Sequence, residues 1–275
     1  MITSVEAQLL EAFDLQDGDR IVTFLTRDRG QVRGVAKGAR RKYSRFAGQL
    51  QPLAKVKVTW FEKEGRDLVR VSGVESVRPS TRLLDELEDI LLTSYLAEHV
   101  QTFVQENESA ELVYRLLDST VEALIAGSGS KPAARELRRQ IATRRFEVWM
   151  LRLAEVFPEL GECPGCGRDL VLGDGAVLPA SADGFYCVEC AGGAGALGGG
   201  AGDDDRVAPG ALAVPPGVMA LLHRFGHARL EELIEQPPPP EHLALIEKIA
   251  SRIRRTFLQH ELKSYGVMRR TLGTG

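Results

Sequence analysis

The chain has 275 residues, of which 44% are hydrophobic and 27% charged, and its formal net charge is −3. This is the composition of an ordinary soluble protein, and the length allows two domains that each have a core. The sequence has no apolar segment of 18 residues, and its N-terminus lacks a basic stretch followed by an apolar run. We therefore expect no membrane span and no signal peptide, and we place the protein in the cytoplasm.

The small net charge hides an uneven distribution. Residues 1–80 hold 15 Lys and Arg against 10 Asp and Glu, whereas the other 195 residues hold 20 against 28. Eight basic residues and a single acid, Asp28, lie within 27–45. A local positive field of this kind predicts an anionic partner.

Residues 1–78 carry the pattern of β structure. The expected strands are 4–13, 19–27, 30–37, 50–62 and 66–77. In the clearest of them Val56, Val58 and Trp60 would face one way, and the residues between them the other. Five short strands in about 80 residues predict a small closed or partly closed barrel. The basic stretch 38–48 would then be a flexible loop between two strands.

Helical periodicity follows Pro79, with Ser80 or Thr81 expected as the N-cap. The expected helices are 83–105, 112–127, 132–156, 215–225, 228–235 and 241–262. Pro132 suits the first turn of the third helix. The glycine-rich segment after the last cysteine, which includes Asp203–Asp205, is expected to be a mobile linker.

The cysteines form two C-x2-C pairs separated by twenty residues. They are Cys163, Cys166, Cys187 and Cys190. This spacing predicts one tetrahedral metal site, with Gly167 and Gly192 easing the backbone beyond each pair. Four thiolates leave no position for water or substrate, so we predict a structural Zn2+ site. Iron or another thiophilic metal, or two disulfides, are the alternatives.

Motifs of enzyme active sites are absent from the sequence. It has no G-x-x-x-x-G-K-[ST] phosphate loop, no G-x-G-x-x-G between a strand and a helix, and no G-x-S-x-G turn. Its acidic residues mostly stand at helical spacing from arginines, which is typical of solvated ion pairs. We therefore predict no catalytic residue and a protein that is not an enzyme. A hydrolase is an alternative, but it lacks a visible nucleophile.

The basic stretch is the candidate binding surface. Cations neutralise phosphates and neighbouring rings stack on bases, which is what single-stranded nucleic acid requires. The candidate DNA-binding residues are Arg27, Arg29, Arg33, Lys37, Arg40, Arg41, Lys42, Arg45, Tyr43 and Phe46. Phe24 and Trp60 are expected in the barrel core instead.

Further arginines lie on two of the expected helices. The candidates for a DNA or partner surface are Arg135, Arg138, Arg139, Arg145, Arg252 and Arg255. The first four either extend the nucleic-acid surface or solvate their helix. The last two flank apolar positions that could receive an acidic–hydrophobic peptide tail or belong to an amphipathic core helix.

Several short motifs occur in a fixed order along nearly the whole chain. They are Thr26-Arg27-x-x-Gly30, Ala36-Lys37-Gly38-Ala39-Arg40-Arg41, Ser44-Arg45-Phe46-x-Gly48, Ser94-Tyr95-Leu96-x-Glu98, Phe157-Pro158-x-Leu160, the two cysteine pairs and Leu262-Lys263-Ser264. On these residues the chain resembles the RecO family of bacterial DNA repair and recombination mediators. It departs from the family pattern in the length of its glycine-rich insert.

The resemblance implies an α+β protein, with an N-terminal five-stranded OB-fold β-barrel followed by an all-α domain with an inserted four-cysteine zinc module. The implied parts are the barrel at 1–79, helices at 80–160, the zinc module at 161–192, a glycine-rich flexible loop at 193–212, helices at 213–265 and a tail at 266–275.

The resemblance also implies function and partners. The family binds single- and double-stranded DNA, anneals complementary strands and works with RecR. It helps to load RecA onto DNA coated by single-strand-binding protein (SSB), whose acidic C-terminal tail docks on the helical domain. The resemblance therefore implies that the protein is cytoplasmic and associates with the nucleoid when it is bound to DNA. A protein–protein adaptor and an RNA-binding protein with an OB barrel and zinc module stay open as alternatives.

Overall fold

The architecture comes from a computed structural model, which describes residues 1–63, 65, 67–171, 173, 175–193 and 210–273. Most of the segment expected as a flexible loop at 193–212, including Asp203–Asp205, lies outside the described residues. Contacts divide the chain into two compact units. The first comprises Met1–Gly129 with Leu262–Gly275, and the second Ser130–Glu261.

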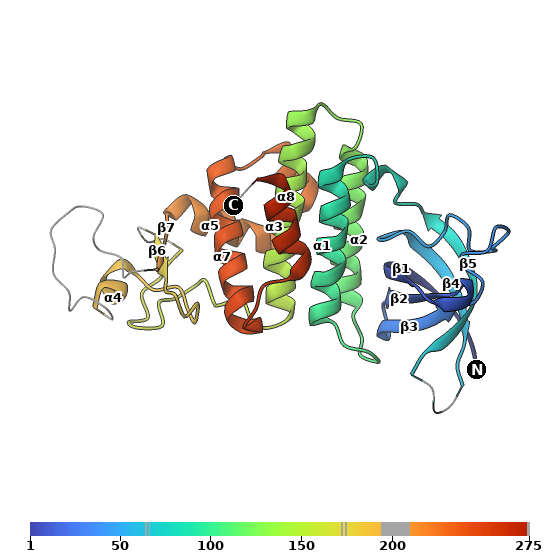
Figure 1. The fold of residues 1–275 in the computed structure, drawn as a ribbon. Helices are drawn as coiled ribbons and strands as arrows, with labels where there is room; N and C mark the ends of the chain where they lie inside the picture. Colours follow the sequence, from blue (N-terminus) through green and yellow to red (C-terminus); the bar gives the residue numbers. More distant parts are fainter. Residues whose placement is uncertain (64, 66, 172, 174, 194–209, 274–275) are drawn as a thin grey trace. The chain divides into compact units, whose positions relative to one another are not determined.

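Five strands close into a barrel in the first unit (Figure 1). They are β1 (Ile2–Asp14), β2 (Arg20–Thr26), β3 (Gly30–Ala36), β4 (Lys55–Phe61) and β5 (Val69–Arg78). The order around the barrel is β1-β2-β3-β5-β4, with β3 and β5 parallel and the other neighbours antiparallel. This topology confirms the expected five-stranded OB-fold barrel.

The alternating side chains of β4 explain how the barrel fills its interior. Val56, Val58 and Trp60 are fully buried, whereas Lys57 between them is exposed. Phe24 of β2 belongs to the same buried cluster, which confirms that Phe24 and Trp60 are core residues.

The strand β4 begins at Lys55 and not at residue 50, as the sequence pattern suggested. The chain before it turns instead of extending. Leu53 has a φ of 59° and its backbone N–H donates to the carbonyl of Leu9 at 2.7 Å. This turn carries the chain from the basic segment back to the barrel wall.

Three α-helices complete the first unit: α1 (Leu87–Phe103), α2 (Glu111–Gly127) and α8 (Lys263–Leu272). Contacts thus group these helices with the barrel, whereas the sequence analysis grouped all helices together. The expected first helix starts four residues late, because the short 3-10 turn η2 (Thr81–Leu83) precedes it. Ser80 is the N-cap residue of η2, but its hydroxyl makes no capping bond and donates instead to the carbonyl of Pro52 at 2.7 Å.

A small polar network fastens α2 to the outside of the barrel. The carboxylate of Asp118 accepts hydrogen bonds from Lys55 Nζ at 3.0 Å and from an Arg78 guanidinium nitrogen at 2.7 Å. Close by, the fully buried Gln8 donates from Nε2 to the carbonyl of Tyr114 at 2.9 Å. The barrel and α2 therefore share buried polar groups that depend on each other.

The helix α8, which packs on α1, covers most of the segment 266–275 that the sequence predicts as a tail, so that prediction misses the helix. Glu98 of α1 supplies its N-terminal acceptor. The backbone N–H groups of Lys263 and Ser264 donate to the two carboxylate oxygens at 3.0 and 2.7 Å, and the Ser264 hydroxyl also donates to Glu98. Two motifs far apart in the sequence, Ser94–Glu98 and Leu262–Ser264, thus meet in one helix cap.

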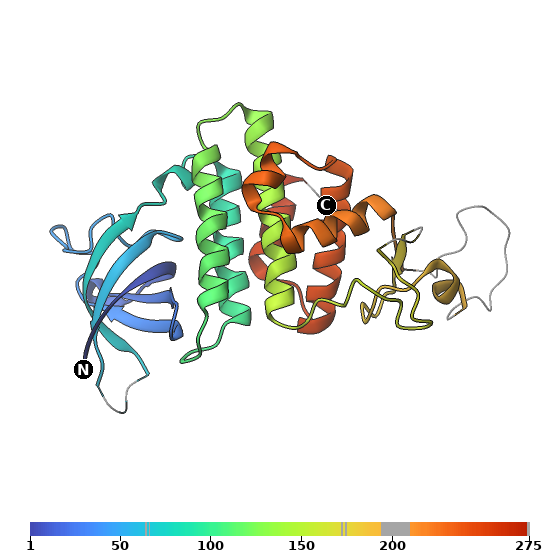
Figure 2. The same cartoon turned by 180° about the vertical axis from the view of Figure 1, so that it is seen from behind.

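The second unit is built on the long helix α3 (Pro132–Leu153), which begins at Pro132 as expected. Around it lie α5 (Pro216–His227), α6 (Leu230–Glu235) and α7 (Pro240–Leu258). Figure 2 shows the orange helices α5 and α6 against α3. The short elements β6 (Ala176–Leu178), α4 (Val188–Gly193) and β7 (Leu212–Val214) belong to the same unit.

The second unit contains ion pairs whose arginines are buried. The Arg144 guanidinium lies 3.2 Å from Glu147 and 3.0 Å from Glu247, and the side chains of Arg144 and Glu147 are almost fully buried. Arg254, which is fully buried, pairs with Glu261 at 2.6 Å. α7 ends at Leu258 and not at residue 262, because Gln259 adopts a left-handed conformation with a φ of 62°.

Within the described residues, no helix combines the length and the apolar character that a membrane crossing requires.

Candidate metal centre and nucleic-acid interface

The first cysteine pair lies on a tight turn. The N–H groups of Cys166 and Gly167 donate to the carbonyl of Cys163 at 3.3 and 2.8 Å. Gly167 has a φ of 72°, a conformation that glycine adopts without strain, as the sequence analysis expected. The turn directs both sulfurs to the same point.

The second pair uses a helix instead of a turn. Cys187 precedes α4 and Cys190 lies in its first turn, where the N–H of Ala191 donates to the carbonyl of Cys187 at 2.9 Å. The expectation that Gly192 eases a tight backbone is wrong, because Gly192 lies inside α4 and has no positive φ.

The four sulfurs come together as predicted. All lie within 4.8 Å of one another, and the Sγ atoms of Cys166 and Cys187 are 3.7 Å apart. A tetrahedral zinc with Zn–S bonds of about 2.3 Å places its sulfurs about 3.8 Å apart. The donor set and its spacing therefore fit a closed metal site, with Cys163 and Cys187 on the buried side.

The pKa values of the cysteines shift in opposite directions: that of Cys163 is lowered, and those of Cys187 and Cys190 are raised. Burial raises the pKa of Cys163, but hydrogen bonds from the backbone N–H groups of Cys187, Gly165 and Cys166 outweigh it and bring the pKa to about 6. Interactions with Cys166 and Cys187 raise the pKa of Cys190 to about 12. Four sulfurs this close resist ionising together unless a cation balances their charge, and a bound metal ion would do so.

Two of the candidate DNA-binding arginines lie on the turn between β2 and β3. Gly30 closes this turn with a φ of 56°, and a Cβ added there would collide with the carbonyl of Gln105. The turn holds Arg27 and Arg29 in place, and each contacts residues of its own unit. Arg27 lies 3.8 Å from Glu111, whereas Arg29 pairs with Glu62 and donates to Asn107 at 3.0 Å.

The other candidate cations lie on β3 and the segment after it. Arg40 pairs with Asp14 at 3.2 Å. Five more are exposed, and none of them makes an ion pair with another residue in the described part of the chain. They are Arg33, Lys37, Arg41, Lys42 and Arg45. We define these five as the basic surface.

The two aromatic candidates differ in their exposure to solvent. Tyr43, next to Lys42 of the basic surface, is 88% exposed, and the Lys42 ammonium lies over its ring, 5.7 Å from the ring centre. Phe46 is only 2% exposed and packs in the barrel core. The expectation that Phe46 stacks on bases is therefore wrong, because solvent does not reach its ring.

The arginines of the second unit are mostly engaged. Arg135 is buried, Arg139 pairs with Glu136, and the Arg145 guanidinium lies 6.0 Å from the centre of the Trp149 ring. Arg135 therefore does not offer a surface cation. Arg138 is half-buried; Arg252, also half-buried, donates to the carbonyl of Leu178 at 3.4 Å, and Arg255 is exposed.

Comparison with known families identifies this arrangement. The family model described as Recombination protein O N terminal matches residues 1–80, and the one described as Recombination protein O C terminal matches residues 84–266.

Curated relatives carry the same description along most of the chain. A DNA repair protein RecO of Anaeromyxobacter sp. (strain K) is 31% identical over 92% of this chain and 89% of its own length. That of Koribacter versatilis (strain Ellin345) is 27% identical over 95% and 96%, and that of Geobacter sulfurreducens is 33% identical over 67% and 71%. The chain therefore belongs to the recombination protein O family.

Proposed function

We propose that this chain is a DNA-binding recombination mediator in DNA repair that anneals complementary single strands. Its relatives named DNA repair protein RecO support the repair role. We further propose that it works in the cytoplasm with RecR and helps to load RecA onto single-stranded DNA coated by SSB. The SSB C-terminal tail would dock on the helical part of the chain.

Annealing makes and breaks no covalent bond, so the proposed activity needs no catalytic residue. Two single strands repel each other through their phosphates. A protein that neutralises the phosphates and leaves the bases accessible lowers that barrier. The required feature is a set of exposed cations that are not already neutralised by the protein.

The basic surface is the observation that carries the proposal. Its five cations are exposed, lie on β3 and the segment that follows it, and make no ion pair within the described residues. Tyr43 stands among them and can stack on a base without reading its identity. In contrast, Arg27, Arg29 and Arg40 would have to exchange carboxylate partners for phosphates.

Salt dependence of binding tests the proposal. If the five cations contact five phosphates of a single strand, log K should fall with log salt at a slope of about −3.5. Strand annealing by the purified protein should slow over the same range of salt. Competition between DNA and RNA of equal length separates the proposal from an RNA-binding role. A slope near zero contradicts it.

Removing two cations locates the surface. Arg41→Ala with Lys42→Ala leaves three contacts, so the slope should fall to about −2.1 and affinity should drop about tenfold. The matched control is Lys63→Ala with Arg70→Ala, which removes the same charge from exposed positions elsewhere on the barrel. Equal losses in both pairs would mean that net charge, and not the basic surface, governs binding.

We also propose that the four cysteines hold a structural zinc ion. When bound, the ion would tie the turn at Cys163 to the start of α4 and supply folding energy, with no open position for catalysis. Metal analysis of the purified protein tests its identity. One equivalent of zinc supports the proposal, and one equivalent of iron overturns it.

A further inference from the structure

The first strand of the barrel is not paired equally on its two sides. Residues Ile2–Gln8 of β1 pair with β4, but pairing with β2 starts only at Ala7. From Ile2 to Glu6, β1 therefore has one open edge. In a closed barrel this is the place where another strand could still be added.

The hydrogen bonds at the end of the barrel show which backbone groups face this open edge. Met1 and Glu62 exchange N–H to carbonyl bonds at 3.2 and 3.0 Å, so the odd-numbered residues of β1 face β4. The N–H and carbonyl groups of Ile2, Ser4 and Glu6 then face the opposite way. No strand of the described chain pairs with Ile2 or Ser4 on this side, because the pairing with β2 begins only at Ala7.

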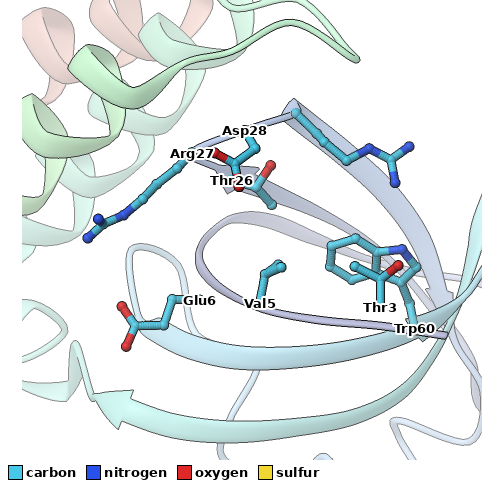
Figure 3. A pocket seen from close by; sticks show the side chains of 8 residues that line it. Thr3, Val5, Glu6, Thr26, Arg27, Asp28 and Trp60 are labelled. Atoms are coloured by element: carbon cyan, nitrogen blue, oxygen red, sulfur yellow. The ribbon is translucent and has the colours of Figure 1, made fainter.

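A pocket of about 430 Å³ lies along the inner side of the open edge (Figure 3). β1 and Trp60 line one side, and the turn between β2 and β3 lines the other. Val5 and Trp60 give an apolar floor. The hydroxyl of Thr3 is buried there without a hydrogen-bond partner among the described residues. The pocket can thus take a side chain of mixed apolar and polar character.

The outer side of the same edge is apolar. Ile2 and Phe61 are neighbours across β1 and β4, and they are 64% and 44% exposed. Met1 beside them is 84% exposed. Large apolar side chains gathered at one end of a barrel favour contact with another polypeptide.

The charged side chains that line the pocket determine which side chain of a partner segment would be complementary to it. Arg27 and Arg29 have carboxylate partners, and Glu6 lies 3.7 Å from Lys55. Asp28, which also lines the pocket, makes no ion pair within the described residues. A cation is therefore the group complementary to Asp28.

We propose that the open edge of β1 binds an extended segment of a partner protein, which adds a strand beside Ile2–Glu6. Alternate apolar side chains of the segment cover the pocket floor and the Ile2–Phe61 face, and a Lys or Arg lies against Asp28. A second copy of this chain fits less well, because its own Ile2–Glu6 segment carries an acid and no cation.

A proline placed in the open edge tests the proposal. The N–H of Ser4 faces away from β4, so Ser4→Pro removes a donor for the added strand but no bond of the barrel. The side chain of Ser4 contacts Thr59 Oγ1 at 3.0 Å, and Ser4→Ala is the matched control that loses this contact while keeping the N–H. The full chain is used throughout.

The probe is a peptide selected by the full-length protein from a displayed library of random decapeptides. Selected sequences should alternate apolar residues and include Lys or Arg. Binding of the best peptide should weaken about tenfold in Ser4→Pro, about fivefold in Asp28→Asn and not in Ser4→Ala. Hydrogen exchange at the Ser4 and Glu6 amides should slow in the complex.

Other outcomes overturn the proposal. No enriched sequence, or equal binding to Ser4→Pro and Ser4→Ala, shows that the edge does not bind peptides. A dimer that Ser4→Pro abolishes would make a second copy the occupant. Slower exchange at Ser4 and Glu6 with an oligonucleotide, and not with the peptide, would assign the pocket to DNA.

Discussion

Asp118 is a single carboxylate on which two nearly buried cations depend. The side chains of Lys55 and Arg78 are only 16% and 17% exposed, and both bond to it. Asp118→Ala should therefore lower the free energy of unfolding by about 2–3 kcal/mol, because it leaves two desolvated charges without their main partner. Urea denaturation measures this. Glu122→Ala is the control: Glu122 also lies 3.4 Å from Arg78 but is 65% exposed, so its loss should cost under about 0.5 kcal/mol.

Tyr43 gives a second prediction for a single residue. Tyr43→Ala should weaken single-stranded DNA binding by at least about fivefold, because stacking on a base is worth about 1–3 kcal/mol. Fluorescence anisotropy with a labelled oligonucleotide measures it. Tyr43→Phe keeps the ring and should bind normally. An equal loss in both variants would show that the ring does not stack and that the hydroxyl matters.

Sequence alone could not separate Tyr43 from Phe46. Both are aromatic, both lie in a basic segment bounded by glycines, and neither stands in a strand whose period would assign it a face. What separates them is the path of the segment after β3, which returns Phe46 to the barrel core. By comparison, Trp60 was assigned correctly, because the alternation of β4 fixed its direction.

At the scale of elements, the cap of α8 gives a prediction about local order. Glu98→Ala removes the acceptor for the N–H groups of Lys263 and Ser264, which should cost about 1–2 kcal/mol of local stability. Amide exchange across 263–272 should accelerate while the barrel strands stay protected. Glu98→Gln keeps one carbonyl oxygen and should show a smaller effect. Unchanged exchange in Glu98→Ala would mean that packing on α1 alone holds the helix.

The sequence predicted best those elements that form because of residues close to one another in the chain. β4 from Lys55 onward follows from alternation, and α2 and α3 follow from apolar periodicity with Gly127 and Pro132 at their ends. The helix α8 was missed because its cap comes from Glu98, 165 residues earlier.

At the scale of the whole molecule, counting charges indicated an anionic partner but not which cations would meet it. Pairing depends on residues distant in sequence, such as Glu111 for Arg27 and Glu62 for Arg29. The clustering of the four cysteines could be predicted with less knowledge of the fold than the pairing of the cations. The C-x2-C spacing alone predicts that the four sulfurs come together, and in the structure they do.

The division into two units predicts that metal and DNA binding can be separated. Cys163→Ser in the full chain should lose its metal and destabilise the second unit by on the order of 3 kcal/mol or more, because a structural metal supplies folding energy. The basic surface belongs to the first unit, so affinity for a single strand should stay within about twofold of the unsubstituted protein. Metal analysis, thermal unfolding and anisotropy on the same preparation measure the metal content, the stability and the DNA affinity.

Val171→Ser, a polar change at an exposed position near the cysteines, is the control and should alter none of the three. Full metal content and full stability in Cys163→Ser would refute the assigned site, whereas a parallel loss of DNA affinity would show that the two units do not act independently.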